Sequence, residues 1–442
     1  MPSQTELPPD QSSSRMKLKV ILWILIVCAG AEFIVRGPLR FLQIPGEWND
    51  LSQNYTASKL WLKGQSPADP NNFIALWKWE SGSRLDLTDI RTHLAPPLGS
   101  LVVMAPVAAF PFRIAKVIWV AILVIAFAAT VWAIMQTGGF RWSELRTLAF
   151  VAVCLALAPF QTGIASGNTT VLVIGLCALA IWAATHRSDV TAGILFGVAC
   201  SLKPQIGAFL VLYFLLRQRW RMFLTAIGTT IGLILVAALY LQVHGASWIH
   251  DYSHNARGFV TANPIDDFSA ANPARFALIN LQVPFFSITG QSSSANSLAF
   301  AVAALLLCAW IYFVVKGRGR CPELLCLGMV SVIALLPVYH RFYDAALLVV
   351  PLCWCVATQV TSSRERSQLI VNASLLLMTP FLFPGAAFLQ ELATDGRIPL
   401  AIVQSWWWNC IVMPHETWAL LLLSIVLLLA MKRQLTTPLP SS

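Results

Sequence analysis

Polar residues beside or within apolar stretches are the ones that could do chemistry in this chain. They are Asp50, His93, Lys203 and the pair His340-Arg341. Charged and polar groups are expensive near lipid, so such residues are candidates for a functional site. A carboxylate can take a proton from a hydroxyl, and a His-Arg pair suits an anionic phosphate ester. These residue types therefore suit the transfer of a group from a phosphate ester to a hydroxyl.

The carboxylate and the lysine each have a structural alternative. Asp50 follows the first apolar run closely, but it is equally suited to cap a helix that starts at Leu51. Lys203 interrupts a long apolar run at Lys203-Pro204, so this run is too long for one simple crossing. A buried lysine needs a carboxylate, a phosphate or water, and Glu32 is a candidate structural partner. Position alone does not decide between these interpretations.

The remaining candidates have structural alternatives as well. His93 precedes Pro96-Pro97, where an interfacial polar residue is an equally simple interpretation. His340-Arg341 lies in a short turn, where Arg341 can reach toward the interface without a ligand. Arg275 lies in a long polar loop. Three histidines of that loop lack strict metal-ligand spacing, so we expect no metal site and no cofactor there: His244, His250 and His254.

The composition restricts the class of protein. Of 442 residues, 57% are hydrophobic and 11% are charged, and the mean hydropathy is +0.68. These values exclude an ordinary soluble enzyme and a disordered chain. Continuous rather than alternating apolar runs exclude a transmembrane β-barrel. We expect an all-α polytopic membrane protein with about 11–13 transmembrane or re-entrant helices.

The polar stretches divide the chain. Residues 1–14 are expected to be a disordered cytoplasmic tail, and residues 15–442 a single integral-membrane domain. Val20–Val35 is the first crossing, with a cleaved signal peptide as the alternative. Polar loops that we expect on the outer face are residues 37–93, 243–295 and 386–413. Within the first loop, Asp50 to Leu62 is predicted to form a short interfacial helix.

The net charge of +10 comes from basic residues at the ends of apolar runs, which indicates cytoplasmic loops rather than a nucleic-acid partner. In the second half these loops are residues 316–320, 362–366 and 432–433. Basic residues are expected on the cytoplasmic side, but for Arg141, Arg146 and Arg187 the sequence does not decide the side. These three arginines reach the cytoplasmic side only if Leu98–Phe110 does not cross the membrane fully and Lys203-Pro204 is the tip of a re-entrant hairpin.

The order of several short motifs resembles glycosyltransferase family 87, the polyprenyl-phosphate-mannose-dependent mannosyltransferases of the membrane-embedded C-type (GT-C) fold. The resemblance extends from about Asp50 to about Pro351. The motifs are Asp50 with Tyr55 and Gly64-Gln65-Ser66-Pro67, Ala95-Pro96-Pro97-Leu98, Gly167-Asn168, Ala192-Gly193 with Gly197 and Lys203-Pro204-Gln205, Arg219-Trp220-Arg221, and Pro337 with His340. The chain departs from the family pattern at Leu51, where an aromatic is usual, and at Asn168, where glutamine is usual.

The resemblance implies a C-type glycosyltransferase fold with two large outer loops and an inverting transfer at the outer face of the cytoplasmic membrane. The donor would be a polyprenyl-phosphate sugar carrying mannose, another hexose or a pentose, and the acceptor a lipid-linked or glycan molecule. Asp50 would be the catalytic base, and His340 would contact the donor phosphate. Further substrate-binding candidates are Lys203, Arg341, Asn168, Tyr55, His93 and Arg275.

Other classes of membrane protein remain as alternatives to an enzyme. A secondary transporter would bind its solute near the bilayer midplane between repeats, and no repeat is evident here. A lipid flippase or a non-catalytic scaffold is a further alternative. Asp50 favours the enzyme.

Overall fold

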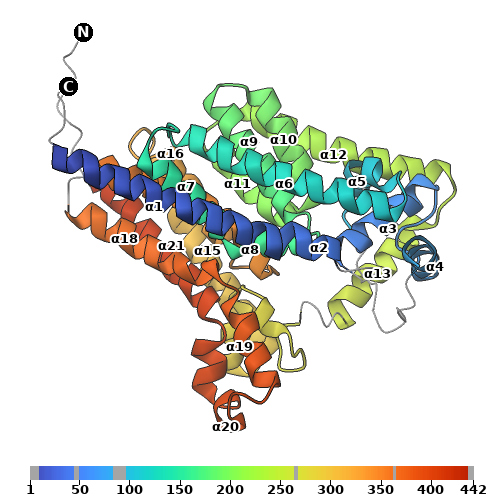
Figure 1. The fold of residues 1–442 in the computed structure, drawn as a ribbon. Helices are drawn as coiled ribbons and strands as arrows, with labels where there is room; N and C mark the ends of the chain where they lie inside the picture. The colour runs from blue at the N-terminus through green and yellow to red at the C-terminus, as the bar shows by residue number, and fades with distance from the viewer. Residues whose placement is uncertain (1–8, 44–48, 83–95, 263–266, 362–364, 437–442) are drawn as a thin grey trace.

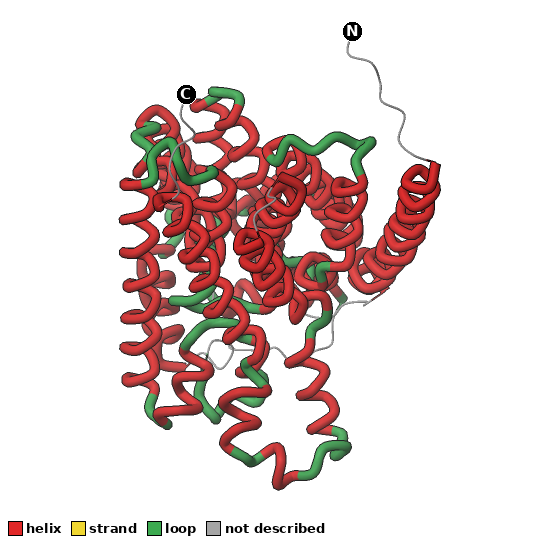
Figure 2. The backbone as a smooth tube through the Cα atoms, turned by 90° about the vertical axis from the view of Figure 1, so that its left-hand side faces the viewer, coloured by secondary structure: helices red, strands yellow, loops and turns green. Residues whose placement is uncertain are grey.

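The protein is a bundle of helices, seen in Figure 1 as a ribbon and in Figure 2 as a tube. The computed structural model describes residues 9–43, 49–82, 96–262, 267–361 and 365–436. In this part of the chain there is no β-strand, and one isolated antiparallel bridge joins Leu278 to Arg341. Six described helices are long and apolar enough to cross a membrane, or up to eight spans if each bent pair counts as one. The predicted all-α polytopic fold is confirmed.

Long helices carry much of the apolar surface that stays exposed. Val27, Leu239 and Leu305, for example, are more than 60% exposed. Such apolar faces suit a lipid surrounding. These helices are α1 (Pro9–Ile34), α6 (Phe112–Thr137), α12 (Trp220–Val243), α15 (Ser292–Lys316) and α21 (His415–Thr436). Two further segments contain breaks, namely η3 (Phe342–Leu348) with α17 (Val349–Thr361), and α18 (Glu365–Met378) with η4 (Thr379–Leu382) and α19 (Gly385–Thr394).

Shorter apolar helices form hairpins whose turns lie inside the protein. The first consists of α7 (Leu145–Ala156) with α8 (Ala158–Ala165), followed by α9 (Thr170–Thr185). The second consists of α10 (Asp189–Leu202) and α11 (Pro204–Leu216). The third consists of α16 (Glu323–Ala334) followed by η3 and α17. Their turns, at residues 166–169, at Lys203 and at residues 335–341, supply much of the site described below.

The turn between α10 and α11 follows from Lys203-Pro204. Proline disfavours a helical conformation in the preceding residue, and Lys203 has extended angles of φ −143° and ψ 86°. Pro204 then begins α11, a position where its missing N–H is harmless. The predicted interruption of the apolar run is therefore confirmed, and it leaves the Lys203 side chain at the tip of a hairpin.

The turn between α8 and α9 depends on Gly167. Its φ of +68° is a conformation that glycine adopts readily, and a Cβ there would lie 2.6 Å from the Phe41 ring. The indole of Trp119 donates a hydrogen bond to its carbonyl at 2.8 Å. This turn delivers Asn168 to the interior, where it is 7% exposed.

The helix α10 packs closely on α12 through small residues. A Cβ on Gly193 would lie 2.6 Å from Thr225 Cβ, and one on Gly197 would lie 2.5 Å from Thr229 Cβ. Such spacing of small residues lets helix backbones approach closely in membranes. The two glycines therefore fix the position of the helix that ends at Lys203.

Connections between helices at one end of the bundle are rich in arginine. Arg318 Nη2 donates to the carbonyl of Leu216 at 2.7 Å, and Arg320 Nη1 to that of Leu435 at 3.1 Å. Arg219 Nε donates to Asp189 Oδ1 at 2.9 Å. We call this end the basic end. It contains residues 139–146, 184–189, 216–221, 316–321 and 431–436.

The arginines in the middle of the sequence belong to the same end. Helices α6 and α9 run side by side in the same direction, with the Trp132 and Trp182 rings 4.8 Å apart, so both end there. The helix α5 (Leu98–Ala108) has only 11 residues, and α10 and α11 form a hairpin that turns back at Lys203. Arg141 and Arg187 therefore lie at the basic end. This arrangement agrees with the alternative in which Leu98–Phe110 does not span the bundle and Lys203-Pro204 is the tip of a re-entrant hairpin.

The opposite end of the bundle holds shorter helices, which belong to the described parts of the three stretches predicted as outer loops. In Figure 1, α3 and α13 lie toward the right and α19 and α20 project below, away from the start of α1. The helices there are η1 (Val35–Leu39), α2 (Arg40–Gln43), α3 (Asp50–Leu62), α4 (Pro70–Ser81), α13 (Trp248–Ala262), η2 (Arg275–Ala277), α14 (Gln282–Thr289), α20 (Leu400–Val403) and η5 (Trp408–Val412). The short helix predicted over Asp50 to Leu62 is present as α3.

Candidate active site

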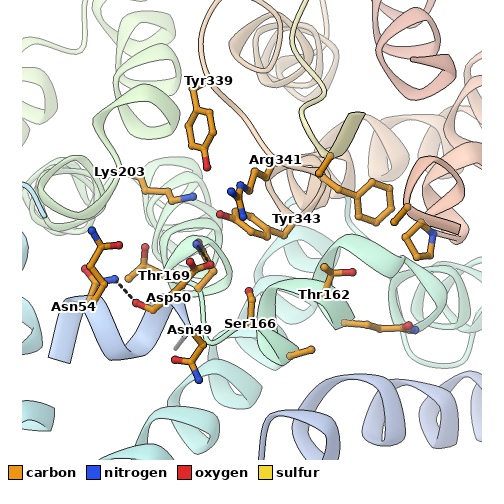
Figure 3. Close-up of a pocket in the computed structure, with 18 of the residues that line it drawn as sticks. Asn49, Asp50, Asn54, Thr162, Ser166, Thr169, Lys203, Tyr339, Arg341 and Tyr343 are labelled. Carbon is orange, nitrogen blue, oxygen red and sulfur yellow. Dashed lines mark hydrogen bonds between the residues drawn. The ribbon is translucent and has the colours of Figure 1, made fainter. Parts of the chain in front are cut away.

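A cavity of about 740 Å³ lies where the hairpin turns meet the start of α3. Figure 3 shows Asp50, Lys203, Arg341 and Tyr343 around it. Its basic lining residues are Arg36, Arg40, Lys203 and Arg341, and its acidic ones are Asp50 and Glu416. Polar lining side chains include Asn49, Gln53, Asn54, Gln161, Thr162, Ser166, Asn168 and Thr169. The volume is within the range of cavities that bind small molecules.

Asp50 is the first residue of α3, but it is not the residue that caps the helix. Asn49 is the cap, since its side chain accepts a hydrogen bond from the Ser52 N–H at 3.0 Å in a capping box. The backbone N–H of Asp50 donates to the carbonyl of Ser166 at 3.1 Å, which ties α3 to the turn between α8 and α9. The interpretation of Asp50 as a helix cap is therefore wrong, and its carboxylate lines the cavity.

Asn168 holds the Asp50 carboxylate. Its Nδ2 donates to Asp50 Oδ2 at 2.7 Å, and its Oδ1 accepts the backbone N–H of Thr170 at 2.9 Å. Both residues were candidates from the sequence, and the structure brings them together. Among the described residues, this hydrogen bond to Oδ2 is the side-chain contact that orients the carboxylate, and Asp50 lines the cavity.

Lys203 forms an ion pair with Asp344. Its Nζ lies 2.7 Å from Asp344 Oδ1 and 2.6 Å from Thr170 Oγ1. Asp344 is 1% exposed, so its charge requires this cation and further hydrogen bonds. The partner considered from the sequence, Glu32, pairs with Arg36 instead, at 2.6 Å. Lys203 therefore has a structural carboxylate as partner and lines the cavity as well.

His340 is completely buried and supports Asp344. Its Nδ1 lies 3.0 Å from Asp344 Oδ2, the oxygen that also accepts the backbone N–H of Arg341 at 3.2 Å. His340 is 0% exposed and does not line the cavity. Its Nε2 is buried with no hydrogen-bond partner among the described residues. In this geometry His340 orients the carboxylate of Asp344.

Arg341 is the neighbour that does reach the cavity. Its guanidinium lies 5.9 Å from the centre of the Tyr339 ring, and Lys203 Nζ lies 4.8 Å from that of Tyr343. In Figure 3 the side chains of Lys203 and Arg341 both point into the space beside Asp50. The cavity thus has a carboxylate on one wall and cations on another, which suits a hydroxyl group next to an anion.

The comparison with protein families agrees with this arrangement. The sequence model of glycosyltransferase family 87 matches residues 96–351, which is more than half of the chain. The chain belongs to glycosyltransferase family 87. No curated protein and no solved structure matches it.

The family 87 match includes some of the site and excludes the rest. Asn168, Lys203 and His340 lie inside it, whereas Asp50 precedes its first residue. The resemblance that we described from about Asp50 is therefore shown only from residue 96 onward. Asp50 is joined to the matched part by its hydrogen bond with Asn168.

Tyr55 lies on the side of α3 that faces away from the cavity of this family 87 protein. Its hydroxyl donates to Glu80 Oε2 at 2.8 Å, and Lys59 Nζ lies 2.9 Å from Glu80 Oε1. Burial acts to raise the pKa of Glu80, but the hydrogen bonds from Lys59 and Tyr55 outweigh it and hold the pKa below its usual value. Burial, with Glu80 nearby, raises the pKa of the Tyr55 hydroxyl. Tyr55 therefore joins α3 to α4 and does not line the cavity.

One other candidate, Arg275, does not line the cavity. Arg275 Nη2 donates to Asn409 Oδ1 at 3.0 Å, and its guanidinium lies against the Phe276 ring. His93 lies outside the described residues. In the part of the chain that the structure describes, no three His, Cys, Asp or Glu side chains gather where they could hold a metal ion.

Several functional candidates were not singled out from the sequence. Asp344 is four residues after His340 in an apolar stretch, and a carboxylate in such a place is a signal that could have been used. Thr170 gives no such signal, because a threonine at the start of an apolar helix is unremarkable. Arg36, Arg40 and Glu416 line the cavity from the two ends of the chain, and only the fold brings them there.

Proposed function

We propose that this membrane glycosyltransferase takes a sugar from a polyprenyl-phosphate donor and transfers it to a hydroxyl of a lipid-linked or glycan acceptor, with Asp50 as general base. The observation that carries the proposal is the Asp50 carboxylate, held by Asn168 at 2.7 Å, in a cavity that Lys203 and Arg341 also line. The sugar would be mannose, another hexose or a pentose.

The electrostatics of the cavity support a phosphate leaving group. Four basic side chains line it, against the two carboxylates of Asp50 and Glu416. A polyprenyl-phosphate sugar brings its leaving group to the membrane, so the protein needs cations for the phosphate and no nucleotide site. We assign the phosphate to the side of the cavity formed by Lys203 and Arg341. His340 supports this side through Asp344, in place of the direct phosphate contact that the family resemblance implies.

The reaction in this cavity is a single displacement. The acceptor hydroxyl oxygen forms a bond to the anomeric carbon of the sugar while the bond from that carbon to the phosphate oxygen breaks. The hydroxyl proton passes to Asp50, and the electron pair of the broken bond leaves with the polyprenyl phosphate. One displacement inverts the anomeric configuration.

Asp50 suits the role of base better than Asp344. Both oxygens of Asp344 are occupied, Oδ1 by Thr170 and Lys203 and Oδ2 by His340 and the Arg341 N–H. Asp344 is 1% exposed, so an acceptor hydroxyl has no access to it. Among the described residues, the Asp50 carboxylate accepts a side-chain hydrogen bond from Asn168, and Asp50 faces the cavity.

The distribution of charge supports a location for the reaction. Basic connections are held on the cytoplasmic side of membranes, and the cavity lies at the end of the hairpins away from the basic end. We therefore propose a multi-pass protein of the cell membrane whose amino- and carboxyl-terminal segments are cytoplasmic and whose cavity opens toward the outer face.

The test is transfer of label from a set of radiolabelled polyprenyl-phosphate sugars into a lipid or glycan fraction by membranes that contain the protein. Asp50→Asn keeps the shape of the side chain and should insert normally. We expect it to lose transfer by about 10²- to 10⁴-fold, the usual contribution of a general base. Asp69→Asn is the matched control, because Asp69 also lies at a helix start, where it caps α4 outside the cavity. Wild-type transfer by Asp50→Asn would exclude this mechanism.

A further inference from the structure

Thr170 is the residue through which two parts of the site are joined. It is completely buried at the start of α9. Its hydroxyl oxygen lies 2.7 Å from Asn168 Oδ1, 2.5 Å from Asp344 Oδ1 and 2.6 Å from Lys203 Nζ. Among the described residues, Lys203 bonds Thr170 and Asp344, and Asp50 bonds Asn168, so the Thr170 hydroxyl joins the ion pair to the amide that holds the base.

On one side, Thr170 determines which way the Asn168 amide faces. The Thr170 backbone N–H donates to Asn168 Oδ1 at 2.9 Å, and the opposite end of the amide, Nδ2, donates to Asp50 Oδ2. If the amide were turned over, its NH₂ group would face an N–H and its oxygen would face a carboxylate, and neither pair can form a hydrogen bond. The orientation that holds Asp50 is therefore set at Thr170.

On the other side, the Thr170 hydroxyl is part of the ion pair. A hydroxyl has one hydrogen to donate, and two acceptors, Asp344 Oδ1 and Asn168 Oδ1, lie within reach of it. Lys203 Nζ donates both to the hydroxyl oxygen and to Asp344. When Lys203 satisfies Asp344, the hydroxyl hydrogen is available to Asn168. When a ligand anion draws Lys203 away, Asp344 competes more strongly for that hydrogen.

We propose that Thr170 is a positioning residue that couples the Lys203–Asp344 pair to the Asp50 base through Asn168. This inference rests on the proposed function, since it assumes a phosphate near Lys203 and a base at Asp50. Binding of the donor phosphate then changes the hydrogen bonds of Thr170 and hence the orientation of the base. The chemical step, rather than donor affinity, depends on the Thr170 hydroxyl.

The experiment removes that hydroxyl without changing the shape of the side chain. Thr170→Val should lower kcat about 5- to 30-fold, as expected for one lost hydrogen bond of 1–2 kcal/mol, with little change in the donor KM. Thr170→Ser should restore kcat. Thr130→Val is the matched control, because Thr130 is also 0% exposed and its hydroxyl bonds only the carbonyl of Ala126 in its own helix.

A double-mutant cycle shows whether Thr170 acts through Asn168. In an Asn168→Ala background, Thr170→Val should have little further effect, because the amide that it orients is gone. An undiminished effect in that background, or a change confined to the donor KM, would mean that Thr170 acts through Lys203 and would overturn the coupling. Wild-type kcat in Thr170→Val would do the same.

A structural measurement keeps the inference apart from the proposed function. In an experimental structure of Thr170→Val, the Asn168 amide keeps the bond from the residue-170 backbone N–H but loses the hydroxyl. We therefore expect the distance from Asn168 Nδ2 to Asp50 Oδ2 to lengthen from 2.7 Å, and an unchanged distance overturns the inference without any assay of activity. Full transfer by Asp50→Asn would instead refute the proposed function. An inactive Asp50→Asn together with a fully active Thr170→Val would refute only the role of Thr170.

Discussion

Asn168 donates a hydrogen bond from Nδ2 to Oδ2 of Asp50 at 2.7 Å, across 118 positions of the sequence. The contact joins the part of the chain that matches glycosyltransferase family 87 to a residue that precedes the match. It also explains how a carboxylate at the start of a short helix keeps one orientation. The helix α3 is also attached to the turn between α8 and α9 by the backbone bond from Asp50 to Ser166.

Asn168→Ala should reduce kcat while leaving the protein folded. A hydrogen bond to a charged group contributes about 1.5–3 kcal/mol, so we expect a loss of roughly 10- to 100-fold. The measurement is steady-state transfer at saturating donor. Asn255→Ala is the control, since it also removes a buried amide, one that bonds the Ala68 carbonyl outside the cavity. Equal kcat values for Asn168→Ala and wild type would show that Asp50 needs no orientation by Asn168.

Lys203→Met should destabilise the protein strongly, because it leaves the buried carboxylate of Asp344 without its cation. Breaking a buried pair in this way costs about 3–5 kcal/mol, whereas removing both charges is much less costly. Lys203→Met with Asp344→Asn should therefore melt at a higher temperature than Lys203→Met alone, measured by thermal unfolding in detergent. A single variant as stable as wild type would contradict the structural importance of the pair.

The same double variant tests whether Lys203 also binds the donor. If Lys203 holds the phosphate, the stable double variant should still show a raised donor KM. An unchanged KM would leave Lys203 with a structural role only.

The sequence predicted those features of the site that depend on local signals. The break at Lys203-Pro204 follows from proline chemistry, and the helix over Asp50 to Leu62 from its polarity, and both are present in the structure. Pairings across the chain have no local signal. Lys203 and Asp344 are 141 positions apart, so Glu32 was as reasonable a partner as Asp344 before the fold was known. The contact of Tyr55 with Glu80, on a different helix, had no local signal either.

The charge asymmetry predicts that the two ends of the bundle lie on opposite sides of the membrane. Cysteines introduced at the exposed positions Lys316, at the basic end, and Asp395, at the end of α19, should react with an impermeant reagent from opposite sides. The exposed native cysteines Cys28 and Cys308 are first replaced by serine. Labelling of both introduced cysteines from one side would overturn the topology and the proposed outer-face location of the cavity.

The packing of α10 on α12 offers a matched pair of glycine substitutions. A Cβ at Gly197 would lie 2.5 Å from Thr229 Cβ and 2.7 Å from the Ala226 carbonyl, whereas a Cβ at Gly228 would meet nothing within 4 Å. Gly197→Ala must therefore push α10 away from α12, at a cost of about 1–3 kcal/mol, while Gly228→Ala should be neutral or slightly stabilising. Thermal unfolding of the two variants measures the difference.

The same substitution also reaches the site, because α10 ends one residue before Lys203. Movement of α10 carries the ammonium away from Thr170 Oγ1 and Asp344 Oδ1, which it contacts at 2.6 and 2.7 Å. We therefore expect Gly197→Ala to lower kcat even at a temperature where the protein stays folded, and Gly228→Ala to keep wild-type kcat. Equal stability and equal kcat in the two variants would show that the close approach of α10 and α12 does not position Lys203.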